Sequence, residues 1–294
     1  MLQDKHPIVI FGATGRQGGS VAKALMKAHW PVRAIVQDPD QAAAVALRDA
    51  GADLVRASFD ETDIIRSIMQ DAYGVFSVLP ANLTAEDEIR HGMSIADMAA
   101  ASGIGHFIYS SGASVGDKPT GVPRFDAKPR IEAHIRTLPL TATIVRPMIF
   151  MDMMVRAGFG LEDGRLVSLI RPDQKMQLTA VEDIGKFVAA ILADRTGFAG
   201  RTLKIASDTV TGTEMAAILT QATGRPFTYS RFPEDIFTAN GDLAQMAESL
   251  ENGPLSRHAD LDELRKLNTE MLSFREWLAG DGNKFLERAL GGNF

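Results

Sequence analysis

The sequence predicts an α/β protein with a doubly wound parallel sheet and a smaller carboxyl-terminal α+β lobe. Three observations support this fold class. Short apolar runs alternate with longer helical patterns through the first half of the chain, a glycine-rich turn follows the first of these runs, and the alternation changes after Arg146-Pro147. Repeated strand-helix-strand units of this kind form parallel sheets with right-handed crossovers.

The predicted strands are short, continuous and rich in Val and Ile, as expected where helices cover both faces of a sheet. In the first half they are Ile8–Phe11, Val32–Val36, Leu54–Ala57, Gly74–Leu79, Phe107–Ser110 and Ala142–Val145. The helices predicted between them are Gly18–Ala28, Asp40–Ala50, Thr62–Ala72, Ala85–Ser102 and Arg130–Thr137. In such a sheet, ligands bind beyond the carboxyl ends of the strands.

The second half of the chain has a different rhythm. After residue 147 only a few strands are predicted, among them Thr202–Ala206 and Pro226–Ser230, within longer helical and loop segments. No Pro/Ser-rich linker separates the two halves. We therefore expect residues 1–147 to form the sheet domain and residues 148–294 a smaller lobe packed intimately with it, with some segments returning to the sheet.

The glycine-rich turn directly follows the first predicted strand and opens a helix. It reads Gly12-Ala13-Thr14-Gly15-Arg16-Gln17-Gly18, a G-x-x-G-x-x-G spacing. Glycines at this spacing allow a tight turn, close backbone approach to a pyrophosphate and close helix-to-strand packing. The helix amino terminus adds N–H groups and a positive dipole end for phosphates. The position between strand and helix favours nucleotide binding over a structural turn.

The end of the second predicted strand is where such folds recognise the adenosine ribose. An acid there selects NAD and a basic residue accepts a 2′-phosphate, but Gln37 is neither. Asp38 is interpreted as a helix N-cap ahead of Pro39 rather than as the ribose acid. Arg16 in the turn offers a positive charge, which tilts the expected cofactor towards NADP, with NAD still possible. Asp60 has two equal readings, a helix cap and an acceptor for the adenine amino group.

Composition narrows the function classes further. The net charge of -6 argues against a general nucleic-acid partner. The chain has no cysteine, no apolar run of about 18 residues that could span a bilayer and no apolar core of a signal peptide, so we expect a cytoplasmic protein without a membrane partner. The six histidines lack metal-ligand spacing, and no metal site is expected.

Several segments, taken in order, resemble the NmrA-like family of atypical short-chain dehydrogenases/reductases. Besides the glycine turn they are Val32-Arg33-Ala34, Ala72 to Phe76, His106 to Ser111, Phe125 to Lys128, Val181 to Gly185 and Ser273 to Leu278. The resemblance implies a Rossmann domain that binds NADP or, less often, NAD, and a small lobe over the nicotinamide. It also implies either a reductase of quinones or dyes or a nucleotide sensor that regulates a protein partner. A homodimer is compatible with both.

The resemblance also implies roles for individual positions. Gly12, Thr14, Gly15, Arg16, Gln17 and Gly18 would hold the pyrophosphate, with Gln37 and Arg16 at the adenosine ribose, Phe59 and Asp60 at the adenine, and Leu79, Pro80 and Ala81 beside the ribose and phosphates. Phe150 would be the ring nearest the nicotinamide. Many relatives that bind NADP have Arg where this chain has Gln37.

Lys128 is the candidate at the nicotinamide end, and three readings of it stay open. In ordinary short-chain dehydrogenases a Tyr that acts as the acid stands four residues before the Lys, whereas this chain has Arg124. Lys128 is then an anchor for the nicotinamide ribose, the reading that the resemblance favours, or a catalytic group, or a solvated charge. Because proline suits the first helical turn, Pro129 predicts that Lys128 lies at the mouth of a helix.

The substrate pocket is predicted from the segment Met148 to Met154. Its methionines are either core residues or the lining of an adaptable apolar pocket, and the two readings are equally supported. An apolar pocket suits a flat quinone or a small carbonyl compound. Tyr109 is expected to pack against a helix, because strand alternation points it away from Ser110. The expected function is therefore NADPH-dependent reduction of a small apolar acceptor or, as the alternative, non-catalytic NADP(H) sensing.

Overall fold

The computed structural model describes residues 6–116, 123–156 and 160–291, except for the side chain of Arg124. The chain divides into two compact units, residues 1–146 with 184–203, and residues 147–183 with 204–294. The first unit is built on a seven-stranded sheet with the order β10-β6-β5-β4-β1-β2-β3. Its strands are β1 (Ile8–Ile10), β2 (Val32–Val36), β3 (Asp53–Arg56), β4 (Gly74–Ser77), β5 (His106–Ser110), β6 (Ala142–Pro147) and β10 (Thr202–Ile205).

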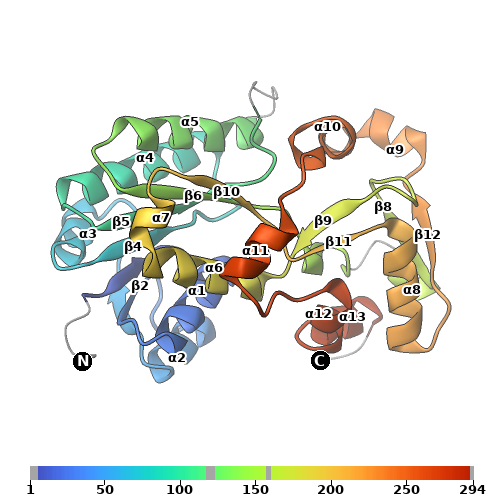
Figure 1. Ribbon diagram of the computed structural model, residues 1–294, viewed down its shortest axis with the longest axis horizontal. Helices are drawn as coiled ribbons and strands as arrows, with labels where there is room; N and C mark the ends of the chain where they lie inside the picture. Colours follow the sequence, from blue (N-terminus) through green and yellow to red (C-terminus); the bar gives the residue numbers. More distant parts are fainter. Residues whose placement is uncertain (1–5, 117–122, 157–159, 292–294) are drawn as a thin grey trace. The chain divides into compact units, whose positions relative to one another are not determined.

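Helices cover both faces of this sheet (Figure 1). They are α1 (Arg16–Lys27), α2 (Ala42–Asp49), α3 (Thr62–Met69), α4 (Ala85–Ala101), α5 (Pro123–Thr137), α6 (Val181–Ala193) and α7 (Arg195–Phe198). The pairs β1 with β2, β1 with β4, β2 with β3, β4 with β5 and β5 with β6 are all parallel. This doubly wound α/β fold confirms the predicted class. The strand order reverses at β1, so the carboxyl ends of β1, β2 and β4 border a switch point where such sheets bind ligands.

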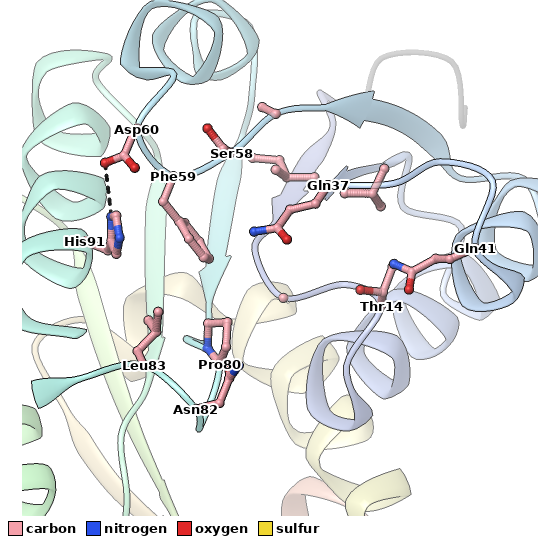
Figure 2. Close-up of a pocket in the computed structure, with 14 residues that line it drawn as sticks. Thr14, Gln37, Gln41, Ser58, Phe59, Asp60, Pro80, Asn82, Leu83 and His91 are labelled. Atoms are coloured by element: carbon pink, nitrogen blue, oxygen red, sulfur yellow. Dashed lines mark ion pairs between the residues drawn. The ribbon is translucent and has the colours of Figure 1, made fainter. Parts of the chain in front are cut away.

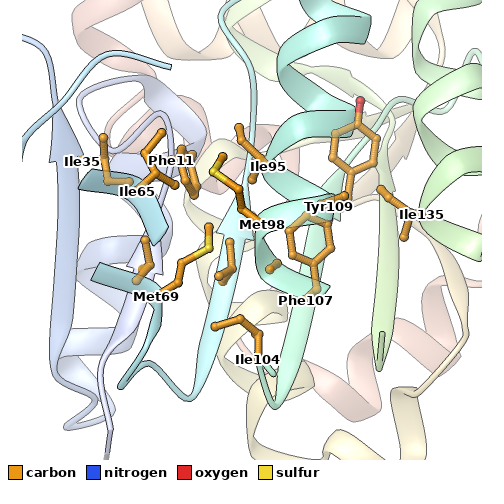
Figure 3. Packing of buried hydrophobic residues seen from close by; sticks show 14 of the residues in the cluster. Phe11, Ile35, Ile65, Met69, Ile95, Met98, Ile104, Phe107, Tyr109 and Ile135 are labelled. Atoms are coloured by element: carbon orange, nitrogen blue, oxygen red, sulfur yellow. The ribbon is translucent and has the colours of Figure 1, made fainter. Parts of the chain in front are cut away.

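The main hydrophobic cluster lies between the sheet and helices α3, α4 and α5 (Figure 3). Phe11 and Phe107 from the sheet side are fully buried, as are Met69 of α3, Ile95 of α4 and Ile131 of α5. Burial of one large apolar side chain contributes about 1.5–3 kcal/mol. The cluster therefore fixes α4 and α5 against the sheet, and these two helices carry the side chains that meet at the end of β5.

The second unit contains two small sheets and several short helices. One sheet has the order β11-β9-β7 and the other pairs β12 with β8. The strands are β7 (Ile149–Phe150), β8 (Arg165–Ser168), β9 (Met176–Thr179), β11 (Asp208–Val210) and β12 (Thr228–Arg231). The helices are η1 (Met151–Met153), η2 (Leu161–Asp163), α8 (Gly212–Thr223), α9 (Glu234–Ala239), α10 (Gly241–Glu251), η3 (Pro254–Ser256), α11 (Leu261–Leu267), α12 (Phe274–Ala279) and α13 (Asn283–Ala289).

Buried polar contacts hold the carboxyl-terminal helices in the second unit. The carboxylate of Asp183 is fully buried and accepts hydrogen bonds from Asn268 Nδ2 at 3.1 Å and the Leu272 amide at 2.9 Å. Asp208 accepts from the Phe274 amide at 2.7 Å. The Trp277 ring stacks on Phe274 at a centroid distance of 5.8 Å. In each case, hydrogen bonds from backbone or side-chain amide donors replace those that the carboxylate loses to water, and they offset the free-energy cost of its burial.

Two predicted element boundaries were wrong. Helix α2 begins at Ala42 with Gln41 as its N-cap, so Asp38 does not cap it, and its Oδ1 instead accepts from the Asp40 amide at 2.9 Å in a turn. Helix α5 begins at Pro123 rather than Arg130, and Pro129 lies inside it. The rule that proline favours the first turn is a preference set by one lost hydrogen bond, and packing of the helix on the core can outweigh it.

Helix α6 contacts α1 closely at a glycine, which gives a stability prediction. The Gly185 amide donates to Ser20 Oγ at 3.2 Å, and a Cβ on Gly185 would lie 2.4 Å from the Ser20 carbonyl oxygen. Because the obstacle is backbone, Gly185→Ala should destabilise the protein by about 1–3 kcal/mol. Gly241→Ala is the control, since a Cβ on Gly241 at the start of α10 meets nothing within 4 Å. Denaturant titration should separate the two variants, and equal midpoints would contradict the close packing.

Candidate cofactor site

The glycine turn after β1 is shaped by two close backbone approaches. Gly12 has a φ of 69°, and a Cβ there would lie 2.6 Å from the Val78 carbonyl oxygen. A Cβ on Gly18 would lie 2.2 Å from the Gly12 carbonyl oxygen. Positive φ together with such short distances excludes any side chain at Gly12, and the second contact excludes one at Gly18. The turn therefore brings the start of α1 against the end of β1, as the spacing predicts.

The amino terminus of α1 has neither a side-chain cap nor an acid, a feature that it shares with α2 and α13. Its N-cap is Gly15, no side chain caps the helix, and its first turn carries no acid. In contrast, α4 is capped by Thr84, which accepts from the Asp87 amide, and has three acids in its first turn. The positive end of the α1 dipole is thus not neutralised by its own first turn. An anion held at the glycine turn would gain from that dipole and from backbone N–H donors.

A cavity of about 420 Å³ opens beside this turn at the carboxyl ends of β1, β2 and β3. This volume is in the range of ligand pockets. The lining residues are Gly12, Thr14, Ile35, Val36, Gln37, Gln41, Ala57, Ser58, Phe59, Asp60, Pro80, Asn82, Leu83 and His91. Of the residues proposed from the sequence, Gly12, Thr14, Gln37, Phe59, Asp60 and Pro80 are brought together here. All of them belong to the first unit.

One wall of the cavity carries an aromatic pair (Figure 2). The Phe59 ring lies 5.0 Å from the His91 ring, centroid to centroid, and 6.3 Å from Phe11. Burial lowers the pKa of His91, so its imidazole is neutral near pH 7. Arg90 Nη2 lies 3.0 Å from His91 Nε2, and because guanidinium only donates, this contact makes Nε2 the acceptor and leaves the ring proton on Nδ1. A neutral aromatic wall suits the face of a flat base.

Asp60 occupies the rim of this wall, but it is not a helix cap. The N-cap position of α3 is Glu61, and Asp60 Oδ1 instead accepts from Arg90 Nη1 at 2.6 Å and lies 3.9 Å from His91 Nδ1. The hydrogen bond from Arg90 lowers the pKa of Asp60. The capping interpretation is therefore corrected. Asp60 lines the cavity as a carboxylate paired with Arg90 of α4, and its role as an acceptor for the adenine amino group stays a prediction.

The opposite wall is neutral and polar. Figure 2 shows Gln37 and Gln41 with Thr14 on the side of the cavity away from His91. Among the described residues that line the cavity, none is Lys or Arg. Arg16, the first residue of α1, is exposed and is not among the lining residues. On this side, the described lining thus supplies amide donors and acceptors rather than a fixed positive charge.

Polar side chains at the end of β5 form a second group of candidates. Ser110 Oγ donates to Gln17 Oε1 of α1 at 2.7 Å, and Ser111 Oγ donates to Glu132 Oε1 of α5 at 2.6 Å. Glu132 is fully buried and receives Arg146 Nη2 at 2.6 Å and Arg136 Nη2 at 2.8 Å. Gln17 is therefore held by β5 rather than being part of the cavity lining. The serines are tied to neighbouring helices, which fixes the strand end.

Lys128 lies at the same strand end and is paired with an acid. Its Nζ donates to Glu88 Oε1 of α4, and the lysine side chain is 28% exposed. The Lys128 methylenes pass over Gly112, where Cδ is 3.6 Å from the position a Cβ would take. Lys128 thus lies within α5 rather than at its mouth, and the pairing corrects the reading of a solvated surface charge. The side chain of Arg124, at the position of the usual Tyr, lies outside the described residues.

Tyr109 packs as expected against the helices. Its side chain is 1% exposed within the cluster formed by α3, α4 and α5, and Figure 3 shows its hydroxyl turned away from the other labelled rings. Burial raises the pKa of Tyr109 well above its ordinary value, and the nearby Glu88 and Glu132 raise it further. The phenol is consequently neutral at any physiological pH. Because it is buried, it does not replace the missing catalytic Tyr at the surface of the site.

The remaining candidates are spread over both units. Gly15, Gly18, Leu79 and Ala81 lie on the segments that carry the lining residues but are not part of the lining. Phe150 is in β7 of the second unit and pairs with Thr179 of β9. Met148, Met151 and Met154 are buried, which favours the core reading for these three methionines. A role for Phe150 at the nicotinamide stays a prediction.

Eight lining residues were not predicted as site residues, namely Ile35, Val36, Gln41, Ala57, Ser58, Asn82, Leu83 and His91. Ser58, Asn82 and Leu83 lie beside predicted positions in the loops that follow β3 and β4, so the position of these loops in the sequence could have predicted them as lining residues. Gln41 is the N-cap of α2 and His91 lies in α4, and a periodic pattern fixes neither the first residue of a helix nor its rotation on the core. Within the described part of the chain, no helix has the length and apolar character needed to cross a membrane. No group of three acids or histidines there suits a metal ion.

The fold and this site define a doubly wound α/β protein with a cavity at the switch point of its sheet. The model of the NmrA-like family matches residues 4–278, and the chain belongs to that family. A relative is an NmrA-like family domain-containing protein of Dictyostelium discoideum. It is 25% identical over 238 residues, which cover 76% of this chain and 79% of that protein.

Two solved structures show the same fold. One is NmrA, a negative transcriptional regulator in complex with NADP, with a TM-score of 0.78 and 23% identity over 97% of this chain and 98% of that one. The other is an NADPH-dependent quinone oxidoreductase of Escherichia coli complexed with NADPH. Its TM-score is 0.78 and its sequence is 24% identical, and the match covers 94% of this chain and 100% of that one. At these identities the likeness establishes the fold alone.

The buried carboxylate of Glu132 generates a prediction about stability and pH. Burial raises its pKa, but hydrogen bonds from Arg146, Ser111 and Arg136 outweigh burial, and the net pKa lies below the ordinary 4.5. Its contribution is therefore complete above about pH 4.5 and is lost as the pH falls through the lower folded-state value. Glu132→Ala leaves Arg146 without its buried partner and should cost about 3–5 kcal/mol at pH 7.

Denaturant titrations of wild type and Glu132→Gln between pH 7 and pH 3 check the sign. The stability gap between them should narrow as the pH falls, because wild-type Glu132 becomes neutral. Glu162→Gln is the control, since Glu162 is an exposed acid of η2 in the second unit. A gap that stays constant down to pH 3 would contradict the ionised, paired state of Glu132.

Proposed function

We propose that this protein binds NADP(H), and also NAD(H), with the adenosine half in the cavity beside the glycine turn. The observation that carries the proposal is the combination at one sheet edge of an uncapped helix terminus, two side-chain-free glycine contacts and an aromatic wall. Phe59 and His91 would receive the adenine face, and Asp60 would accept from its amino group. Gln37 and Gln41 would bond the ribose hydroxyls, and the first amides of α1 would bond the pyrophosphate.

The chain's own residues also suit the nicotinamide end. Lys128 would donate to the nicotinamide ribose hydroxyls, which makes it an anchor rather than an acid. Ser110 and Ser111 stand at the same strand end and would border the ring. The bound cofactor, when reduced, would supply hydride. Leu79, Pro80 and Ala81 follow β4 and would run beside the ribose and phosphates.

We propose that the reaction is reduction of a small apolar acceptor such as a quinone or a carbonyl compound. Support comes from the family, which includes proteins described as oxidoreductases, and from the quinone oxidoreductase of the same fold. A quinone accepts hydride without a dedicated protein acid, because the negative charge spreads over the ring and water can deliver the proton. Such an acceptor is compatible with the missing Tyr, whereas an ordinary ketone needs the acid at once.

A second candidate is a nucleotide sensor that regulates a protein partner. Two observations favour it: Arg124 stands where the catalytic Tyr is expected, and the NmrA regulator shares the fold. In this case the second unit would carry the partner surface, and binding of NADP(H) would change its contacts. The two candidates share the cofactor site and differ in turnover and in whether partner contacts change with NADP(H).

Titration with NADPH and NADH, followed by a screen of quinone and carbonyl acceptors, tests the proposal. We expect saturable binding of both cofactors and cofactor oxidation with at least one quinone. Lys128→Ala should weaken binding by about ten- to hundredfold, since it removes a charged hydrogen-bond donor worth about 1.5–3 kcal/mol. Affinity that survives while turnover collapses would instead make Lys128 a participant in the chemistry. Binding without turnover, with partner contacts that follow NADP(H), would favour the sensor.

The neutral ribose wall predicts weak discrimination between the two cofactors. Gln37→Arg should raise the affinity for NADPH about tenfold, because guanidinium binds the 2′-phosphate with charged hydrogen bonds, and should leave NADH binding nearly unchanged. Gln70→Arg is the matched control, since Gln70 follows α3 and is not part of the cavity lining. Fluorescence titration of both cofactors measures the ratio. An unchanged ratio in Gln37→Arg would place the ribose elsewhere.

A further inference from the structure

Glu88 is a buried carboxylate that the proposed cofactor contacts do not use. It lies in the first turn of α4, is 8% exposed, and accepts a hydrogen bond from Lys128 Nζ of α5. The two residues are 40 positions apart in the chain, so the pair depends on the packing of the two helices. This packing is close, as a Cβ on Gly92 of α4 would lie 2.7 Å from Ile131 Cδ1 of α5.

The neighbouring buried acid does not compete for the lysine. Glu132 already holds Arg146, Arg136 and Ser111 through hydrogen bonds of 2.6–2.9 Å. The other ionisable group close by is Tyr109, which burial keeps neutral. Of these three groups, only Glu88 is shown bonding the ammonium of Lys128. A carboxylate this buried needs a cationic or donor partner to offset its lost hydration, and Lys128 fills that need.

We propose that Glu88 is a positioning residue that orients Lys128 for the nicotinamide ribose. An ammonium has three N–H donors, and Glu88 takes one of them. Nζ is fixed on the α4 side and the methylene stem lies over Gly112. Glu88 is the partner recorded for Nζ among the described residues, and the other two N–H donors would meet a ligand at the end of β5. This inference rests on the proposed function, in which Lys128 meets the cofactor.

The energetic consequence is that the lysine is ordered before the cofactor binds. A free lysine side chain loses rotamer freedom when it is fixed, and binding to a disordered one costs about 0.5–1.5 kcal/mol more. In this protein that ordering is done by folding. The side chain is still 28% exposed, so it is held without being closed off from a ligand.

The test compares NADPH with ADP, which has the adenosine half but no nicotinamide ribose. Glu88→Ala should lower NADPH affinity about three- to tenfold, the factor that corresponds to ordering one side chain, and should leave ADP affinity unchanged. Glu88→Gln keeps an acceptor and the side-chain shape, so its loss should be smaller. In a Lys128→Met background, Glu88→Ala should have no further effect. Glu86→Ala is the matched control, an exposed acid of the same helix turn.

Several outcomes overturn the inference. These are an equal loss of ADP and NADPH affinity in Glu88→Ala, the same loss in the Lys128→Met background, or no loss at all. If Glu88→Ala does not fold, Glu88→Gln decides in the same way, with and without Lys128→Met. Failure of the wild-type protein to bind NADPH is a separate result, which overturns the proposed function and this inference with it.

Discussion

The contact between Gly12 and the first turn of α1 is the constraint on which the candidate site depends. With a φ of 69° at Gly12 and room for no Cβ at Gly18, the chain reverses directly from β1 into α1. The reversal brings the uncapped helix terminus to the sheet edge where β2 and β3 also end. Because the strand order reverses at β1, the connections that follow β1 and β4 run in opposite directions along the sheet and leave a crevice between them. The cavity follows from this reversal, and its lining is supplied by the adjacent strand ends.

A second constraint acts at the end of β5, where two acids are buried close to one strand. Burial of either carboxylate without a partner would cost several kcal/mol. Arg136 and Arg146 form ion pairs with Glu132. Lys128 forms an ion pair with Glu88. Arginine forms a rigid fork that satisfies both oxygens of one carboxylate, whereas lysine binds through one point and keeps donors to spare. The structural acid thus takes the cation suited to a fixed network, and the other acid takes the cation that can still bind a ligand.

The sequence predicted the sheet well and the side-chain pairing poorly, for different physical reasons. Each of the first six strands was located within two or three residues, because a strand covered on both faces must be continuously apolar. The seventh strand, β10, was predicted as a strand, but its place beside β6 is a long-range pairing that no local pattern encodes. The first strand-turn-helix unit predicted Gly12, Thr14 and the turn, because backbone sterics are local. The place of His91 depends on how α4 is rotated on the core, and that of Gln41 on where α2 begins, and both are decided by packing with residues elsewhere in the chain.

The corrections at Asp38, Asp60 and Pro129 all concern local preferences, namely capping or the first helical turn. Asp38 forms a turn with the Asp40 amide instead of a cap, whereas contacts distant in sequence decide the other two positions. Asp60 pairs with Arg90 of α4, 30 residues away, and Pro129 lies inside a helix whose buried face carries Ile131 and Ile135. Core burial of two such side chains is worth more than the single hydrogen bond that the proline removes. Lys128 therefore lies within a packed helix rather than at a helix end, and its ammonium is bonded to the Glu88 carboxylate of a neighbouring helix. Helix packing thus fixes the position of the lysine, and a fixed hydrogen-bond donor is what the proposed role as an anchor requires.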